Sequence, residues 1–316
     1  TFNKLSKPLR ILSILRGRWD EQRVPSLQAL ADLGHEVVYV DKILDLDDYY
    51  KLVKKIHFDI ILFWGSSLQN FLNSFPGKFF LEEMNLPYIS LWTDNTIKHL
   101  HLLKEMNTSL HLGMFIPDTR VIEQLNSVGW YNVFYLPPWH IDANIFKPQP
   151  PNSKINREVS FAATFNPYLA ERTKWRAGWN EKMNNAGNSI IKLSREINGY
   201  VDVFDFLNDE WDVKSEQFSR ISHAMYFEQK SIIREQLIKQ LDDVEVEITG
   251  IGSAQSNQSN VKMGEGLEWW NLSPFFCSSI INLNLTPWPR SCHHRVFQIS
   301  ASGAFVLSDW KDDAVK

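Results

Sequence analysis

The 316-residue sequence lacks several features by which a class of proteins is usually recognised. It has only two cysteines, Cys277 and Cys292, without the spacing of a zinc site or a redox pair. We therefore expect no disulfide scaffold, but buried thiols in a reducing, cytoplasmic compartment. No run of about 18 uncharged apolar residues occurs, so no transmembrane helix is predicted. The formal net charge is −4 and neither half is basic, so a broad nucleic-acid-binding surface is not expected.

Short catalytic motifs are also scarce. There is no GxxxxGK[ST] phosphate loop, no complete GxGxxG, no HExxH and no GxSxG. Gly250-Ile251-Gly252 follows a predicted strand, but the third glycine of a dinucleotide-binding turn is missing. His293-His294 stand next to Cys292 without carboxylate or histidine partners at ligand spacing. We therefore predict neither a metal site nor a bound cofactor.

Aromatic residues, in contrast, are abundant at 13% of the chain. Such an excess is typical either of well-packed cores or of exposed rings that stack on bases or sugars, and we favour packing. Trp175, Trp179 and Met183 follow one another at helical spacing, which predicts one apolar helical stripe. Trp269 and Trp270 are also assigned to packing.

The first half alternates apolar strands with helical patterns. Predicted strands are 9–15, 36–40, 58–64, 88–92, 111–116 and 133–136, and predicted helices are 22–33, 49–56 and 119–128. This rhythm is typical of βαβ units on a parallel sheet.

A proline-rich stretch, 136–152, then predicts a linker. The second half resumes with predicted strands at 158–163, 244–248, 280–285 and 304–307. Between the first two, residues 165–243 have helical character, including a helix around 232–241, and are far longer than a simple crossover requires. The sequence thus predicts two Rossmann-like α/β domains, 1–148 and 149–316, facing a central cleft, with ligands outside the carboxyl ends of the strands.

Residues 273–309 are the most informative segment. They predict a strand, a polar loop containing Ser291, a short helix over 294–302, a stop at Gly303 and a further strand. Helix N-terminal amides together with Arg295 suit a diphosphate, and Gln298 suits a ribose. The alternative is a capped helix whose arginine pairs with a carboxylate, and the residues alone leave both open.

Residues 281–309 resemble the donor-binding segment of CgeB-like (spore maturation protein type) glycosyltransferases of the GT-B group. The resemblance is carried by Ile-Asn-Leu-Asn at the start of this segment and by Arg-Val-Phe-Gln-Ile-Ser-Ala-Ser-Gly-Ala-Phe-Val-Leu-Ser-Asp at its end. Residues 135–148 are similar to the interdomain linker of that family, and 159–164 to the opening strand of its second domain. The resemblance implies a GT-B-like fold and transfer of a sugar from a nucleotide-sugar donor to an acceptor, without a metal. The family continues with further helices where this sequence stops, so we expect the chain to be part of a longer protein.

The resemblance also implies roles for particular residues. Arg295 and the amides near His293 and His294 would meet the diphosphate, and Gln298 stands where the family usually has a glutamate that binds the ribose. Thr164 would face the cleft, while Gly264 and Gly266 would lie near the base. For the group that accepts the proton of the acceptor hydroxyl we name Asp94 first and Asp20 second, because both follow predicted strands. The alternative for either residue, equally suited to its position, is to cap a helix. The acceptor class stays open among glycan, protein and small molecule, and a nucleotide-sugar epimerase and a non-catalytic sugar- or nucleotide-binding module remain as alternatives.

Overall fold

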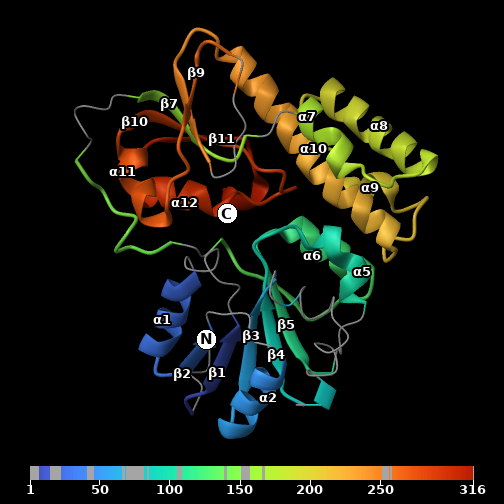
Figure 1. Cartoon of the computed structure of the whole chain (residues 1–316), viewed down its shortest axis with the longest axis vertical. Coiled ribbons are helices and arrows are strands. Elements are labelled where there is room, and N and C mark those ends of the chain that lie inside the picture. The colour runs from blue at the N-terminus through green and yellow to red at the C-terminus, as the bar shows by residue number, and fades with distance from the viewer. Residues whose placement is uncertain are drawn as a thin grey trace. The chain divides into compact units, whose positions relative to one another are not determined.

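A computed structural model describes residues 7–14, 23–40, 46–65, 68, 82–83, 85–104, 109–138, 141–150, 157–165, 168–250, 256 and 258–315. The chain divides into two compact units, Thr1–His140 and Ile141–Lys316. Each unit is built around its own sheet (Figure 1). The segment 141–148, which we expected to end the first domain, belongs to the second unit, because Phe146 is buried there against Phe275 and Phe276.

The first unit contains a six-stranded parallel sheet in the order β2-β1-β3-β4-β5-β6. Its strands are β1 (Arg10–Ile14), β2 (Glu36–Val40), β3 (Ile60–Trp64), β4 (Tyr88–Leu91), β5 (His111–Ile116) and β6 (Val133–Tyr135). β1 pairs with β2 through Ile11 opposite Val37, and with β3 through Ile11 opposite Ile60. The chain reverses direction across the sheet between β1 and β3, as in doubly wound folds.

Two described helices of the first unit, the 3-10 helix η2 (Thr96–His99) and α6 (Thr119–Ser127), begin at a side-chain cap. The other helices of this unit among the described residues are α1 (Val24–Asp32), α2 (Leu46–Lys55) and α5 (Leu100–Leu103). Asp118 caps α6 by accepting bonds from the amides of Arg120 and Val121. In the core, the buried indole of Trp64 donates a hydrogen bond to Ser13 Oγ at 3.2 Å.

The second unit contains a five-stranded parallel sheet in the order β11-β10-β7-β8-β9. The strands are β7 (Arg157–Ala162), β8 (Val246–Thr249), β9 (Val261–Gly264), β10 (Ser279–Asn284) and β11 (Val306–Ser308). β9 lies in a stretch for which the sequence analysis predicted no strand. The switch of direction falls between β7 and β10, so the carboxyl ends of these two strands are where a ligand of such a fold is expected. The sequence prediction of α/β architecture with two parallel sheets is thus confirmed.

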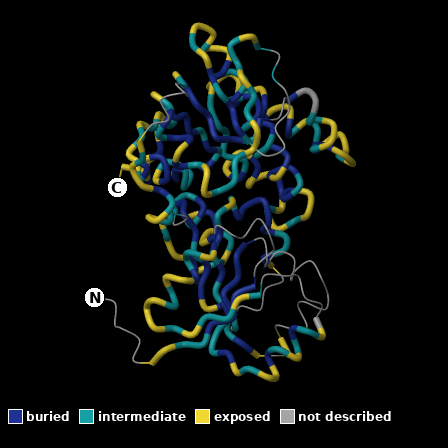
Figure 2. The backbone as a smooth tube through the Cα atoms, turned by 60° about the vertical axis from the view of Figure 1, so that its left-hand side comes forward, coloured by how far each residue is buried: buried dark blue, intermediate teal, exposed yellow. Residues whose placement is uncertain are grey.

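The two faces of this sheet are covered differently (Figures 1 and 2). α11 (Leu272–Cys277) and α12 (His294–Ala301) pack on one face, where Phe275, Phe276 and Ile299 are buried. The other face contacts Ile238 of the long helix α10 (Glu216–Gln240). Three shorter helices, α7 (Tyr168–Trp175), α8 (Glu181–Glu196) and α9 (Val203–Leu207), pack against α10 and complete the helical elaboration that the sequence predicted.

The predicted helical stripe of Trp175, Trp179 and Met183 is wrong. α7 ends at Trp175, Gly178 adopts a positive φ of 70°, and Asn180 caps the following helix by accepting from the amide of Met183. The four-residue spacing of Trp175, Trp179 and Met183 therefore spans a turn between two helices. The rings still pack rather than project: Trp175 stacks on Phe227 with centroids 5.9 Å apart. Likewise, the helix expected around 232–241 is the last part of α10.

A buried ion pair joins Arg176, the residue directly after α7, to α10 within the elaboration. Glu228 is fully buried and accepts from Arg176 Nε at 2.5 Å and from Arg176 Nη2 at 2.6 Å. Asn188 of α8 accepts a further bond from Arg176 Nη1 at 2.7 Å. This two-pronged geometry pairs both charges, so neither the guanidinium of Arg176 nor the carboxylate of Glu228 is buried without a partner.

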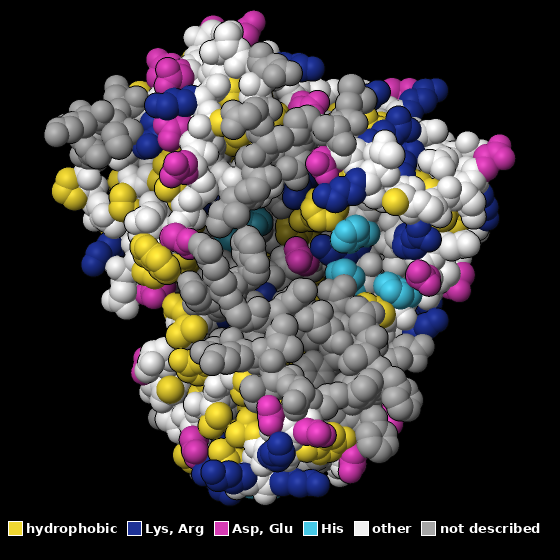
Figure 3. Space-filling view, in the orientation of Figure 1, with side chains coloured by type: hydrophobic (Ala, Val, Ile, Leu, Met, Phe, Trp, Pro, Cys, Tyr) yellow, Lys and Arg dark blue, Asp and Glu magenta, His cyan; other side chains and the backbone are white. Residues whose placement is uncertain are grey.

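Positive and negative side chains are interspersed on the face shown in Figure 3, as the small net charge predicts. Within the described residues, no helix combines the length and apolar character needed to cross a bilayer. Even α10, with 25 residues, carries charged side chains along its whole length.

Candidate anion-binding site in the second unit

The site begins at the N-terminus of α12, which follows β10 through the loop 285–293. His293 caps the helix, its Nδ1 accepting from the amide of Arg295 at 3.2 Å, and the rings of His293 and His294 lie 3.8 Å apart. The first turn of α12 contains no acidic side chain. The positive end of the helix dipole is therefore not balanced by a carboxylate of its own first turn.

Arg295 lies in this first turn and is partly exposed, with the inner part of its guanidinium buried. Its Nε is buried and has no hydrogen-bond partner among the described residues. Burial, together with the charge of Arg234, lowers the pKa of Arg295 from 12.5 to about 9. The side chain therefore remains charged at neutral pH in surroundings that disfavour the charge.

Arg234 is the second buried guanidinium, and it comes from α10. Only 7% of the residue is exposed, its Nη1 donates to the carbonyl of Thr164 at 2.6 Å, and its Nε has no partner among the described residues. The guanidinium also lies 5.1 Å from the ring of Phe161. Burial lowers the pKa of Arg234 as well.

Within the described part of the chain, no carboxylate lies within 4.0 Å of either arginine. Asp309 is near enough to favour the charged form of Arg234, but it forms its own ion pair with Lys311 at 3.0 Å. Two neighbouring buried cations without a paired anion are costly, since each disfavours the charge of the other. An anion bound between them would remove that cost, so we identify Arg234 and Arg295 as the arginine pair of a candidate anion site.

More polar atoms without partners occur on the elements around this pair. Tyr200 OH, Asn284 Oδ1 and Thr286 Oγ1 are buried and have no hydrogen-bond partner among the described residues. Asn284 ends β10, Thr286 follows it, and Tyr200 is near enough to Arg234 to influence its pKa. Because buried polar groups in proteins are nearly always hydrogen-bonded, such a concentration is typical of a place that a polar ligand or water occupies.

The structure brings several of the residues predicted for donor binding into this region. Thr164 contacts Arg234 through its carbonyl. Gln298 is buried one turn after Arg295 in α12, and Ser291 is buried with its Oγ donating to the carbonyl of Cys292 at 3.0 Å. The alternative in which Arg295 pairs with a carboxylate is not observed among the described residues.

Gly264 and Gly266 lie elsewhere. Gly264 ends the edge strand β9, which is three strands from β10, and Gly266 is exposed in the loop that follows. At about 4.8 Å per strand, this separation is roughly 14 Å. One phosphate cannot contact both places, whereas a ligand as long as a nucleotide can extend from α12 toward β9.

Of the two predicted catalytic carboxylates, the described residues include Asp94. Asp94 belongs to the first unit, follows β4, is 59% exposed and lies 3.7 Å from Lys98 Nζ. It does not cap the following helix, because Asn95 accepts from the amide of Ile97 instead. Asp20 lies outside the described residues.

Arg234 and Tyr200 were missed by the sequence analysis, which treated residues 165–243 as packing only. The available signal was an arginine directly after the apolar pair Ile232-Ile233, before Leu237 and Leu241 of the same helical pattern. A charged side chain on a helix face that packs against a core is an indication of a partner or a ligand.

Comparisons with known proteins add little to this picture. No known protein family matches the chain, and no curated protein matches it either. Among solved structures, 22 chains match. One is the apo form of the lipopolysaccharide outer core galactosyltransferase WaaB, with 9% sequence identity and a TM-score of 0.45, covering 96% of this chain and 81% of that one. The resemblance to CgeB-like glycosyltransferases stays a prediction.

Proposed function

We propose that this protein is a glycosyltransferase that takes its sugar from a nucleotide-sugar donor, with the donor diphosphate held by Arg234 and Arg295. The observation that carries the proposal is the pair of buried guanidiniums without a paired carboxylate, at the start of α12 and beyond the ends of β7 and β10. Guanidiniums bind phosphate oxygens through several donors in a fixed plane, and a helix N-terminus adds amide donors. The motif resemblance of residues 281–309 supports the same role.

The chemistry that such a site supports is stabilisation of a leaving diphosphate. When the bond between sugar and diphosphate breaks, negative charge develops on the phosphate oxygen, and two positive groups in surroundings of low polarity stabilise it strongly. The two arginines supply the positive charge that a divalent cation supplies in other enzymes, so we propose a reaction without a metal. Asp94 is our proposed group for accepting the proton of the acceptor hydroxyl.

The proposal is tested first by binding. Isothermal titration with UDP-, GDP- and ADP-linked sugars and with the corresponding nucleoside diphosphates is expected to identify a ligand for the wild-type protein. Arg295→Gln and Arg234→Gln should each weaken that ligand at least tenfold, since each removes a charge-assisted contact to the diphosphate. Arg220→Gln, on an arginine that donates to the carbonyl of Ala177, is the matched control and should bind normally.

Turnover separates the remaining alternatives. Release of nucleoside diphosphate in the presence of an acceptor, unaffected by EDTA, is the expected result. Conversion of one nucleotide sugar into its epimer would indicate an epimerase, and tight binding without turnover would indicate a binding module. The proposal is lost if no nucleotide sugar binds, or if binding is the same in both arginine variants.

A further inference from the structure

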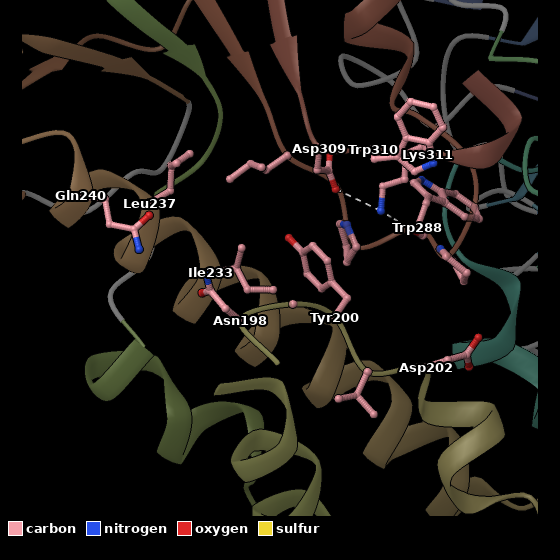
Figure 4. A pocket seen from close by; sticks show the side chains of 15 residues that line it. Asn198, Tyr200, Asp202, Ile233, Leu237, Gln240, Trp288, Asp309, Trp310 and Lys311 are labelled. Carbon is pink, nitrogen blue, oxygen red and sulfur yellow. Dashed lines mark hydrogen bonds and ion pairs between the residues drawn. The ribbon is translucent and has the colours of Figure 1, made fainter. Parts of the chain in front are cut away.

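A cavity lies within the second unit, lined in part by Asp309 and Tyr200, which are near enough to Arg234 to influence its pKa. Its volume is about 470 Å³, within the range of roughly 300–1,000 Å³ that is usual for small-molecule sites. It is lined by the loops that follow β10 and β11, by α10, and by the turn 198–202 (Figure 4). Gln229 holds this turn in place, since its Oε1 accepts from the amide of Val201 at 2.7 Å and its Nε2 donates to the carbonyl at 3.2 Å.

The charges on the cavity wall disfavour an anion. Lys311 is the one cation among the described lining residues, and it is already engaged: its Nζ donates to the carbonyl of Trp288 at 2.5 Å and pairs with Asp309 at 3.0 Å. Asp202 adds a second carboxylate to the lining. Asp202 also caps α9, its Oδ1 accepting from two backbone amides of that helix. The described lining residues thus include no unpaired cation for a phosphate or carboxylate, while their carboxylate oxygens can accept hydrogen bonds from hydroxyl groups.

The aromatic residues of the cavity include one surface ring, Trp310. Trp310 is 75% exposed, yet its indole Nε1 donates to Asp312 Oδ1 at 3.1 Å. Trp288 is buried, and Tyr200 lies with its ring 5.4 Å from Lys311 Nζ. Because most of the Trp310 side chain is exposed while its N–H is engaged by Asp312, the apolar faces of its ring are accessible to a ligand.

We propose that this cavity binds an uncharged pyranose ring, with Trp310 as the stacking surface and Asp309 as an acceptor for the sugar hydroxyls. A pyranose presents C–H groups on one face and hydroxyls around its rim, which matches a flat ring beside carboxylates and amides. Asn198 and Gln240 supply further amide groups on the wall.

The sugar has two possible sources. It is either the sugar part of the nucleotide-sugar donor, or a unit of a glycan. The first source rests on the proposed function and agrees with the nearness of Asp309 to Arg234. The second is independent of the proposed function.

The test uses the whole chain and defined sugars. Saturation-transfer NMR and titration with methyl glycosides of glucose, galactose, mannose and N-acetylglucosamine should detect binding of at least one of them, with methyl glucuronide at least tenfold weaker. Trp310→Ala should weaken the sugar about tenfold, whereas Trp310→Phe keeps a ring and most of the affinity. Trp270→Ala is the matched control, because Trp270 is also exposed, at 53%, but does not line the cavity.

Further titrations distinguish the two sources. If Trp310→Ala weakens a nucleotide sugar but not its nucleoside diphosphate, the sugar belongs to the donor. If it weakens neutral oligosaccharides and leaves the nucleotide sugar unchanged, the sugar belongs to a glycan. The cavity proposal is overturned if no glycoside, oligosaccharide or donor sugar depends on Trp310 in a protein that remains folded by circular dichroism. Binding of glycosides without binding of any nucleotide sugar would refute the proposed function and leave the cavity proposal standing.

Discussion

Replacing Arg295 by methionine is expected to make the ligand-free protein more stable. The pKa of Arg295 falls from 12.5 to about 9 in the folded protein. At about 1.36 kcal/mol per pKa unit, the charged side chain costs the native state up to about 5 kcal/mol relative to the unfolded chain. Methionine keeps an apolar chain of similar length, and replacing buried charges with apolar groups is often stabilising by about 1–4 kcal/mol. Because Arg295 keeps part of its surface in water, we expect a gain of about 1–3 kcal/mol.

The matched control is a buried arginine that has its carboxylate. Arg176 bonds to Glu228 through two nitrogens, so Arg176→Met leaves the fully buried carboxylate of Glu228 without its cation. This variant is expected to lose about 3–5 kcal/mol of stability. The change in stability is thus expected to have opposite signs in the two variants. This difference would distinguish an arginine that binds a ligand from an arginine that stabilises the fold.

The assay is urea unfolding with and without pyrophosphate, followed by circular dichroism. Pyrophosphate at about 100 times its dissociation constant should stabilise the wild-type protein by about 2.7 kcal/mol. Arg295→Met should reduce this effect, and Arg176→Met should keep it provided the variant folds. Our reasoning is refuted if Arg295→Met is destabilising to the same degree as Arg176→Met, or if pyrophosphate stabilises wild type and Arg295→Met equally.

Three further predictions concern other parts of the molecule. Burial lowers the pKa of His111 to about 4, so below pH 6.5 the unfolded chain binds a proton that the native protein does not. The free energy of unfolding should therefore fall by about 3 kcal/mol between pH 6.5 and pH 4. In urea titrations, His111→Gln should reduce this dependence of stability on pH. A methyl group at Gly250 would lie 2.3 Å from the carbonyl oxygen of Ala163 and 2.7 Å from the amide nitrogen of Thr164. Gly250→Ala should therefore displace the backbone at the end of β7 and weaken donor binding in calorimetry. Normal donor binding by this variant would contradict the prediction. Asp94→Asn should lower kcat at least 100-fold with little change in donor affinity, and an unchanged rate would remove Asp94 as the base.

Much of the fold was predictable because buried parallel strands have a local signal. A run such as Ile11-Leu12 before a polar break, or Phe63-Trp64 before Gly65, predicts its own strand. Of the eleven strands in the described part of the chain, six lie within predicted ranges and four more extend one residue beyond theirs. β9 was missed because its four residues include Lys262 and end in glycine. The prediction that Trp175 and Trp179 lie on one helix was wrong for the opposite reason. Their helical spacing continues across the turn at Gly178, which separates the two helices.

The candidate site was predictable only in part. Arg295 and Gln298 stand in one short segment, where a strand, a polar loop and a helix follow each other, so local reasoning predicts their position. Arg234 reaches the same place from a helix about 60 residues earlier in the chain, and its contact to Thr164 spans 70 residues. No local pattern contains that contact, because it depends on how α10 packs against the sheet.

The position of Arg234 gives the helical elaboration a role beyond packing. One helix, α10, carries Glu228, which is fixed by Arg176, and Arg234, less than two turns further on, which extends to the carbonyl of Thr164. Gln229 of the same helix holds the turn that presents Tyr200. Because a buried arginine without a paired anion is unfavourable, the protein lowers its free energy if that side chain moves toward water. The ion pair of Glu228 with Arg176 holds α10 in place and so opposes this movement of Arg234. We therefore infer that the stability lost at Arg234 and Arg295 is offset by the well-bonded contacts of α10, and that loosening α10 by Glu228→Gln would weaken donor binding without changing any group in the site.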